Sequence, residues 1–427
     1  MPFRIALSGL DAASTDLQVT GHNIANASTN GFKQSRAEFA DIYATSIQDV
    51  SATAAGRGVK VTSVAQQFGQ GNLDFTANNL DLAINGEGFF IMHDDGGNVS
   101  YTRAGAFGVD RDGNVVDHAN QRLQVFSPID AAGSRFNTGS TTDLVLPTLS
   151  GAPSATSDIS AALNLSSFEI QPVVAWPGPP ANDDESNVTT DMYNHATSTT
   201  VYDSLGTSHR ATMYYAKTAN PGEWETYTYV DGTLTSGPGG NGQSTLVFDS
   251  AGRLDVTAGD VNAQGQLTLA AWNNAGNGSD PITLTYGYIN STQYGADFAV
   301  NDLTQNGYTA GRLSGIDVDN SGIVFARFTN GQSQALGKVA MARFNNAQGL
   351  RQLGNTSWAE TFTSGDAQLG EAGTSSFGLI QSGALENSNV DISEQLVNLI
   401  TAQRNYQANA QVISTADTIT QTIINIR

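Results

Sequence analysis

Four polar residues near position 320 have the spacing of a calcium-binding loop. Asp317, Asp319, Ser321 and Gly322 match its first, third, fifth and sixth positions. The twelfth position, where such a loop needs a bidentate glutamate, is occupied by Phe328. The pattern therefore favours a polar turn between two strands, and we predict no metal site there.

A second motif, glycines followed by a lysine, could hold a phosphate group. Gly331, Gly337 and Lys338 are spaced one residue too widely for a phosphate loop, and Val339 stands where Ser or Thr would bind magnesium. No two of the five histidines have metal-type spacing, and we expect them at the surface or at helix ends. Without cysteine, thiol catalysis and disulfides are excluded. We predict that the protein is not an enzyme and needs no cofactor.

Acidic residues are concentrated in the middle of the chain. The net charge is −21 over 427 residues, and residues 146–304 alone contribute −13. Such a charge argues against nucleic acid as a partner. No apolar run is long enough to span a membrane, so we also predict no membrane insertion. The nearly neutral ends are the parts that can be buried against other copies of the chain.

An apolar stripe near the N-terminus predicts a helix. Phe3, Leu7, Leu10, Leu17 and Ile24 recur at steps of four, three, seven and seven residues, as in a heptad pattern. The stripe ends near residue 26, and the Asn-Gly pair at 30–31 is suited to the left-handed conformation that follows a helix.

The C-terminal segment repeats this pattern over a greater length. Neither proline nor glycine occurs between Val390 and Arg427, which predicts one long helix. Its polar face consists of Asn, Gln, Ser and Thr with few charges, so few ion pairs can stabilise it in isolation. We expect both terminal helices to become ordered when they pack in an assembly.

The middle of the chain alternates polar and apolar residues, which is typical of β-strands. Examples are the runs at 88–92, 224–229, 282–288, 323–328 and 338–344. We predict a mainly β, α+β fold with discontinuous β domains and with the two terminal helices paired in a coiled-coil-like inner domain. The expected division is a helical domain of 1–30 and 385–427, a connecting segment of 31–70 and 365–384, a first β domain of 71–145 and 305–364, and an acidic outer β domain of 146–304, possibly two.

Several motifs at both ends resemble the flagellar rod–hook family of bacterial axial proteins. They include Leu7-Ser-Gly-Leu10, Asn23-Ile-Ala-Asn26, Thr29-Asn-Gly-Phe-Lys33 and the run from Ser382 to Asp391. Within this family the insert at 146–304, with Val201-Tyr-Asp-Ser-Leu-Gly206, is similar to the hook branch rather than to the shorter rod proteins. A distal rod protein and, in a different class, a secreted β-rich adhesin are the alternative interpretations.

The resemblance implies a function and a set of partners. Hook subunits polymerise outside the cell into a flexible, curved tube that transmits torque from rod to filament as a universal joint. The implied partners are further copies of the chain, the rod protein at the proximal end, the hook cap during assembly, the hook–filament junction protein at the distal end, and the flagellar type III export apparatus. Export without a cleaved Sec signal is also implied.

The helical ends are the expected assembly interface. Packing of the two helices within one copy, and a simple helix stop at Asn23, Asn26 and Gly31, are the competing interpretations. The residues that we predict to form the interface are Leu7, Leu10, Leu17, Asn23, Ile24, Asn26, Gly31, Phe32, Leu396, Leu399, Tyr406, Ile413 and Ile424.

Overall fold

The computed structural model describes residues 2–42, 56–130, 133–147, 151–176, 183–235, 237–239, 242–273, 276–374 and 376–425. The chain forms two compact units. The helix-bearing unit comprises Met1–Thr148, Ser314–Arg327 and Ser333–Arg427, and the insert unit comprises Leu149–Leu313 and Phe328–Gln332. Each unit is described separately.

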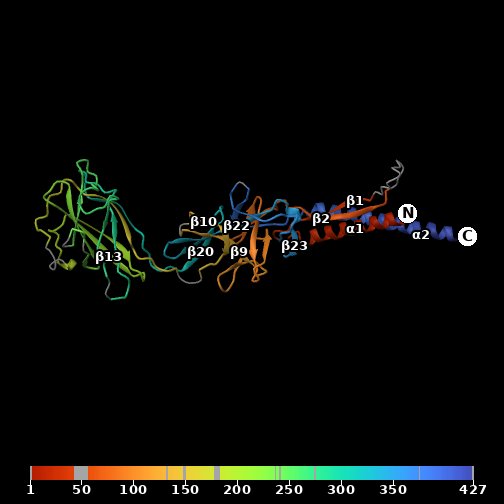
Figure 1. The fold of residues 1–427 in the computed structure, drawn as a ribbon, viewed down its shortest axis with the longest axis horizontal. Coiled ribbons are helices and arrows are strands. Elements are labelled where there is room, and N and C mark those ends of the chain that lie inside the picture. Colours follow the sequence, from red (N-terminus) through yellow and green to blue (C-terminus); the bar gives the residue numbers. More distant parts are fainter. Residues whose placement is uncertain are drawn as a thin grey trace. The chain divides into compact units, whose positions relative to one another are not determined.

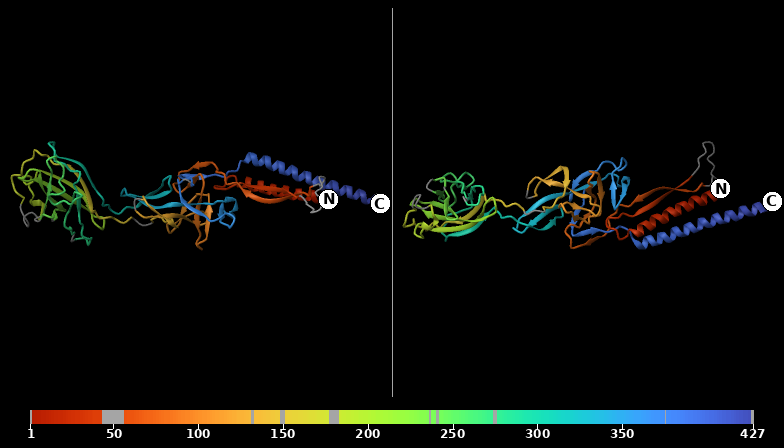
Figure 2. Two further views of the ribbon diagram at one scale, coloured as in Figure 1. Left: turned by 45° about the horizontal axis from the view of Figure 1, so that its top comes forward. Right: turned by 90° about the horizontal axis from the view of Figure 1, so that it is seen from below.

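Two long helices lie at the ends of the chain, α1 (Pro2–Ala25) and α2 (Ile392–Asn425). The carboxylate of Asp391 caps α2 because its Oδ1 accepts the backbone N–H groups of Ser393 (2.8 Å) and Glu394 (3.2 Å). The two helices lie side by side, and α2 extends past the start of α1 (Figures 1 and 2). The predicted fold class, mainly β with paired terminal helices, is confirmed.

Most of the helix-bearing unit is β-structure. A hairpin of two strands packs against α1. The unit also contains a 12-stranded sheet and two further short strand pairs. The strands are β1 (Ser35–Asp41), β2 (Val59–Gln66), β3 (Leu73–Phe75), β4 (Leu82–Asn85), β5 (Phe89–His93), β6 (Val99–Thr102), β7 (Gly108–Val109), β8 (Val115–Val116), β9 (Arg122–Pro128), β10 (Phe136–Asp143), β20 (Leu313–Val318), β21 (Ile323–Phe328), β22 (Ser333–Arg343), β23 (Arg351–Gly354), β24 (Ser357–Ala359), β25 (Gln368–Glu371), β26 (Leu379–Ser382) and β27 (Ala384–Glu386).

Strands from the two halves of the sequence pair with one another in this unit. Met341 of β22 lies opposite Phe90 of β5, and Trp358 of β24 lies opposite Tyr101 of β6. The short pairs β3–β27 and β4–β26 join the same two halves closer to the helices. The chain therefore leaves the helices, passes through the sheet, and returns through it, which brings α1 and α2 together.

The insert unit contains a 4-stranded and a 5-stranded sheet. One apolar core includes residues of both, among them Leu163, Met213, Trp224 and Tyr286. The strands are β11 (Asp158–Asn164), β12 (His195–Tyr202), β13 (Ser208–Lys217), β14 (Glu223–Val230), β15 (Thr233–Thr235), β16 (Gln243–Val247), β17 (Gln266–Thr268), β18 (Thr285–Gly287) and β19 (Ala299–Gln305).

The expected strands are present, with different lengths. The prediction at 323–328 coincides with β21, and the one at 224–229 lies within β14. The run at 282–288 is a strand only from Thr285 to Gly287, because Ile282 forms an isolated bridge with Trp272 instead. The expected turn at Asp319 is also present, since its Oδ1 accepts the amides of Ser321 and Ile323.

One histidine differs clearly from its predicted surface position. His209 is buried in the insert unit, where its ring nitrogens lie 2.6 Å from Asp231 Oδ2 and 3.3 Å from Asp203 Oδ2. Asp203 is also fully buried, and the amides of Leu205 and Thr207 donate to its Oδ1. The spacing of histidines along the sequence gave no signal of these contacts, which depend on the fold.

The ionised form of Asp203 is expected to stabilise the insert unit. Burial alone would raise the pKa of this carboxyl, but hydrogen bonds from the Thr207 amide, Asn277 and His209 lower it to about 2. Because the unfolded carboxyl titrates near pH ~4, the stabilisation is complete above that pH and is lost as the pH falls toward 2.

We therefore expect Asp203→Asn to lower the free energy of unfolding by about 1–3 kcal/mol at pH 7, since charged hydrogen bonds are lost. The difference from the wild type should shrink as the pH falls from about 4 to about 2. This difference in the free energy of unfolding can be measured by urea unfolding, with tryptophan fluorescence as the signal. Three of the four tryptophans lie in this unit. A difference that is independent of pH over this range would contradict the assignment.

Candidate assembly interface

The helices α1 and α2 contact each other through small and polar side chains. A Cβ added at Gly9 would lie 2.6 Å from Asn409 Oδ1, so the Asn409 side chain of α2 packs directly against the glycine of α1. Nearer the other end of α1, Asn23 Nδ2 donates to Gln395 Oε1 at 3.1 Å. These two contacts show that the helices run antiparallel. The side chains buried in the described parts of both helices are Ala6, Ala12, Ala13, Thr20, Asn23, Gln395 and Ala402.

The large apolar side chains of the same helices fall into two groups. Some, such as Leu10, Leu17 and Leu399, are partly buried. Eleven others are at least 37% exposed, and Val397 and Ile424 exceed 60%. A soluble helix usually turns its large apolar residues toward a core, so these side chains lack the partner that their pattern requires. We call them the apolar helix surface: Phe3, Ile5, Leu7, Ile392, Leu396, Val397, Ile400, Tyr406, Val412, Ile419 and Ile424.

The close contact at Gly9 gives a test of the helix pair. We expect Gly9→Leu to destabilise the pair by about 1–3 kcal/mol, because the added side chain occupies the space of the Asn409 amide and displaces it from the helix contact. Gly21→Ala is the matched control: no atom lies within 4 Å of its added Cβ, so it should stabilise the helix by about 0.5–1 kcal/mol. Thermal unfolding followed by the helical circular dichroism signal measures both. Equal effects would contradict the contact.

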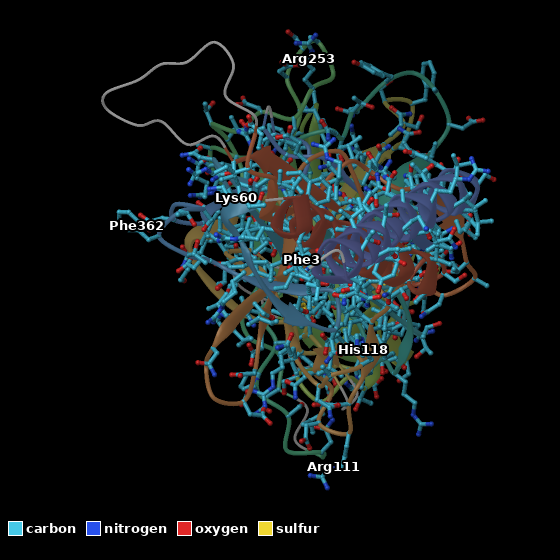
Figure 3. The ribbon with its side chains drawn as sticks, turned by 90° about the vertical axis from the view of Figure 1, so that its right-hand side faces the viewer. Phe3, Lys60, Arg111, His118, Arg253 and Phe362 are labelled. Carbon is cyan, nitrogen blue, oxygen red and sulfur yellow. The ribbon has the colours of Figure 1, made fainter. Side chains whose placement is uncertain are left out.

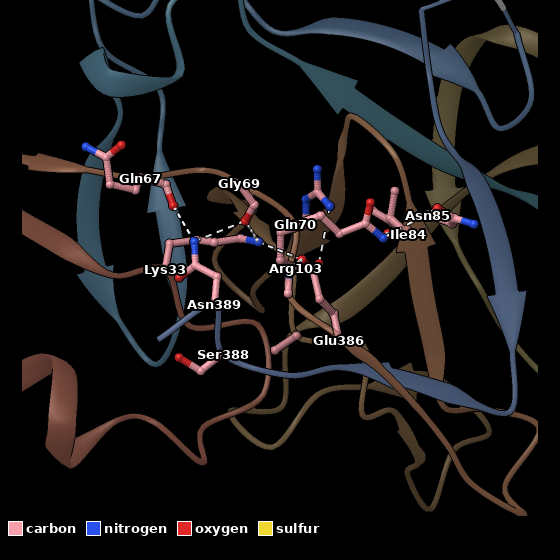
Figure 4. Close-up of polar contacts among 12 residues, drawn as sticks. Lys33, Gln67, Gly69, Gln70, Ile84, Asn85, Arg103, Glu386, Ser388 and Asn389 are labelled. Carbon is pink, nitrogen blue, oxygen red and sulfur yellow. Dashed lines mark hydrogen bonds and ion pairs between the residues drawn. The ribbon is translucent and has the colours of Figure 1, made fainter. Parts of the chain in front are cut away.

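A buried ion cluster joins the helix pair to the sheet. Lys33 Nζ lies 2.6 Å from Glu386 Oε1, and Arg103 Nη1 lies 3.2 Å from Glu386 Oε2 (Figure 4). The side chains of Lys33 and Glu386 are fully buried. Burial lowers the pKa of Lys33 and of Arg103, and the carboxylate of Glu386 opposes both shifts. The cations are therefore tolerated in the interior because this one carboxylate is present.

Backbone groups complete this cluster. Lys33 Nζ also donates to the Gly69 carbonyl at 2.8 Å, and the Gly71 amide donates to Glu386 Oε1 at 2.9 Å. Asn389, just before α2, donates from Nδ2 to the Gln67 and Gly69 carbonyls (Figure 4). Segments near residues 33, 68, 103 and 386 are thus fastened at one point.

Asn23, Gly31 and Phe32 lie at this junction and are buried. Asn23 Nδ2 donates to the Ser35 carbonyl, and the Ser35 amide donates to Asn23 Oδ1, which connects α1 to β1. Gly31 has a φ of 70°, and a Cβ there would lie 2.4 Å from the Ala104 amide nitrogen. A side chain at position 31 would therefore both strain the backbone and collide with the sheet.

The structure places the predicted interface residues in three settings. Asn23, Gly31 and Phe32 lie in the buried junction just described. Exposed on the helices are Leu7, Leu396, Tyr406 and Ile424. Partly exposed are Leu10, Leu17, Ile24, Asn26, Leu399 and Ile413. Their contact with other copies stays a prediction.

Sequence reasoning missed the roles of Lys33, Arg103, Glu386 and Asn389. Lys33, Glu386 and Asn389 occur within the motifs given above for the family resemblance, and the segments around all four residues contain few other charges. An isolated charged residue in a neutral segment could have indicated that its side chain has a specific partner.

In the part of the chain that the structure describes, no group of three or more His, Asp or Glu is arranged to hold a metal ion. None of the described helices is long and apolar enough to cross a membrane.

Comparisons with protein-family models show the class of protein to which the chain belongs. Four family models match successive parts of the chain: "Flagella basal body rod protein" over residues 3–33, "Flagellar hook protein FlgE/F/G D1 domain" over 83–171, "Flagellar basal body protein FlaE D2 domain" over 173–308, and "Flagellar basal body rod FlgEFG protein C-terminal" over 381–426. All four describe axial proteins of the bacterial flagellum.

Comparisons with curated proteins identify one family within this class. The chain is 37% identical to flagellar hook protein FlgE of Escherichia coli over the full length of both, and 32% identical to that of Borreliella burgdorferi over 99% of this chain and 98% of the relative. The chain belongs to the flagellar hook protein FlgE family, and it is a structural subunit of the flagellar hook. The crystal structure of Helicobacter pylori hook protein FlgE2 has a similar fold, with a TM-score of 0.53 at 15% identity, covering 74% of this chain and all of that one.

Proposed function

We propose that copies of this hook subunit bind one another through the apolar helix surface, and that the helices form the inner layer of the polymer. The observation that carries this proposal is the separation of side chains on the helix pair. The helix side chains that are buried within one copy are small or polar, whereas eleven large apolar side chains of the helices are exposed. Self-polymerisation within the flagellar axis is a property of the family.

The energetics support contacts between copies. Burial of one exposed Leu or Ile contributes about 1.5–3 kcal/mol when complete, and roughly half of that remains available for a side chain that is half exposed. Eleven such side chains on one helix pair exceed what a monomeric surface normally displays. The two helices also carry few charged residues, so the copies repel one another weakly at this surface.

The hook tube that results is flexible and transmits torque from rod to filament as a universal joint. At its proximal end it meets the rod protein. This contact is supported by the match of residues 3–33 and 381–426 to rod-protein families, since similar helix pairs can pack in one continuous layer. The hook cap, the hook–filament junction protein and the type III export apparatus are the further partners that the family resemblance supports.

Export without a cleaved signal is part of the same proposal. The family resemblance alone supports it.

Deletion of residues 392–427, which contain α2, tests the proposal. We expect the truncated protein to keep its β-sheet circular dichroism and a cooperative melting transition, because both β units have cores of their own. It should fail to form polymers under salt conditions in which the full chain does, as seen by electron microscopy. Polymers formed by the truncated protein would refute the role of the helices.

A further inference from the structure

A fully exposed phenylalanine projects from the sheet of the helix-bearing unit. Phe362 lies in the loop that follows β24, and no part of its side chain is covered. Figure 3 shows it pointing away from the molecule on one side. Isolated apolar residues at a surface are common, so exposure alone indicates nothing.

The loop that presents Phe362 is firmly held. Thr361 Oγ1 donates to the Gly349 carbonyl at 2.6 Å, and the buried Ser364 accepts the Thr361 amide at 2.8 Å. Asn346 Nδ2 also donates to the Thr363 carbonyl at 3.0 Å. The loop backbone that carries Phe362 is therefore held in place, so binding has to order only the side chain.

The same unit contains a hollow of about 540 Å³ beside the end of α1. Its lining includes the aromatic residues Phe32 and Trp358, the small Ala106, and the imidazoles of His22 and His118. The other lining residues are mostly Asn, Gln, Thr and Ser, with one Lys. Pockets that bind a ligand usually measure about 300–1,000 Å³. The hollow is large enough for one aromatic side chain and its neighbours.

The wall of the hollow has an unusual backbone. Asn355 and Thr356, at the tip of the β23–β24 hairpin, have φ values of 52° and 55°. A β-branched residue rarely adopts this conformation, and such strain persists mainly where the surroundings impose it, often at binding sites. The Thr356 carbonyl is held by a hydrogen bond from Thr102 Oγ1 at 2.9 Å.

The charges around the two features are complementary. Phe362 is flanked in the sequence by the exposed carboxylates of Glu360 and Asp366. None of the described residues that line the hollow carries a carboxylate, although the chain has 40 acidic residues, and two lining residues are histidines. An aromatic ring with acidic neighbours is thus the kind of segment that the hollow accepts best.

We propose that Phe362 of one copy inserts into the hollow of a neighbouring copy. The inference rests on the proposed function, because it assumes that copies pack side by side in a polymer. Phe362 and the hollow lie on different parts of the surface of one unit, with Phe362 and His118 on different sides in Figure 3. A contact between two different surfaces can be repeated indefinitely and produces a helical polymer, whereas a contact between identical surfaces closes as a dimer.

The absence of cysteine allows a direct test by crosslinking. Thr363→Cys places one thiol beside Phe362 and leaves the ring intact, and Ala106→Cys places another in the exposed lining of the hollow. Polymers of the double variant, treated with a short thiol-reactive crosslinker, should give a ladder of covalent multimers on a denaturing gel. Either single variant should give none.

Two controls define the contact. Arg111→Cys in place of Ala106→Cys puts a fully exposed thiol on the same unit but outside the hollow, and no ladder is expected. Adding Phe362→Ser to the double-cysteine variant should remove the ladder. The melting temperature should not change, because the ring contacts nothing within one copy. The same substitution alone should raise the critical concentration for polymerisation at least about tenfold, as for a buried aromatic at an interface.

The outcomes separate the two proposals. Polymers without a ladder would refute the insertion of Phe362 and leave the helix-mediated assembly intact. Crosslinked dimers of a single-cysteine variant would also refute it, because they require a contact between identical surfaces. Failure of the helix deletion to prevent polymerisation would overturn the proposed function itself.

Discussion

Glu386→Ala is expected to lower the free energy of unfolding of the helix-bearing unit by about 3–5 kcal/mol. The substitution removes the only carboxylate that contacts both Lys33 and Arg103 among the described residues, and the Lys33 amine is fully buried. Two uncompensated cations would remain in the interior. The Gly71 amide would also lose its acceptor.

The magnitude can be measured by urea unfolding at neutral pH. Glu38→Ala is the matched control, because Glu38 forms an ion pair with Arg36 whose side chains are 42% and 67% exposed. Exposed pairs of this kind contribute about 0–1 kcal/mol. If the two substitutions had similar effects, the buried cluster would not be the element that fastens the helices to the sheet.

The second large effect is expected on assembly rather than on stability. Leu396→Ser combined with Ile400→Ser should raise the critical concentration for polymerisation by about 10- to 100-fold. The two side chains are 46% and 49% exposed in one copy. Burying the remainder of each in a polymer contributes about 0.7–1.5 kcal/mol, and about 1.4 kcal/mol corresponds to tenfold.

A matched control uses the same spacing on the same helix. Gln407→Ser combined with Gln411→Ser replaces two exposed polar side chains of α2 and should leave both folding and polymerisation nearly unchanged. Sedimentation of polymers against total protein concentration gives the critical concentration, and circular dichroism shows that the helices persist. Equal polymerisation of the two double variants would contradict the apolar helix surface as an interface.

The sequence predicted the helices and most strands because these depend on local periodicity. The stripe from Phe3 to Ile24 and the run after Asp391 correspond to α1 and α2. The contact between the helices could not be predicted in the same way. It uses Gly9, Asn23 and Gln395, which the apolar pattern ignores, and it depends on an antiparallel register that sequence spacing does not contain.

The ion cluster shows why the junction was harder to predict. Lys33 and Glu386 are separated by 353 positions, and Arg103 and Glu386 by 283. Local propensity gives no information about such a pairing. It arises because β3 and β27 bring the two halves of the chain together just before the helices. The parallel pairing of β18 with β11 in the insert unit is non-local for the same reason.

The buried cluster at Lys33, Arg103 and Glu386 has a mechanical consequence. A load applied to the helices reaches the sheet through several short, charge-assisted links as well as through the two covalent strands of the chain. These links are expected to resist rotation of the helices relative to the sheet. The compliance that lets a hook curve is then expected outside this joint, while the helices and the sheet of the helix-bearing unit turn together during rotation.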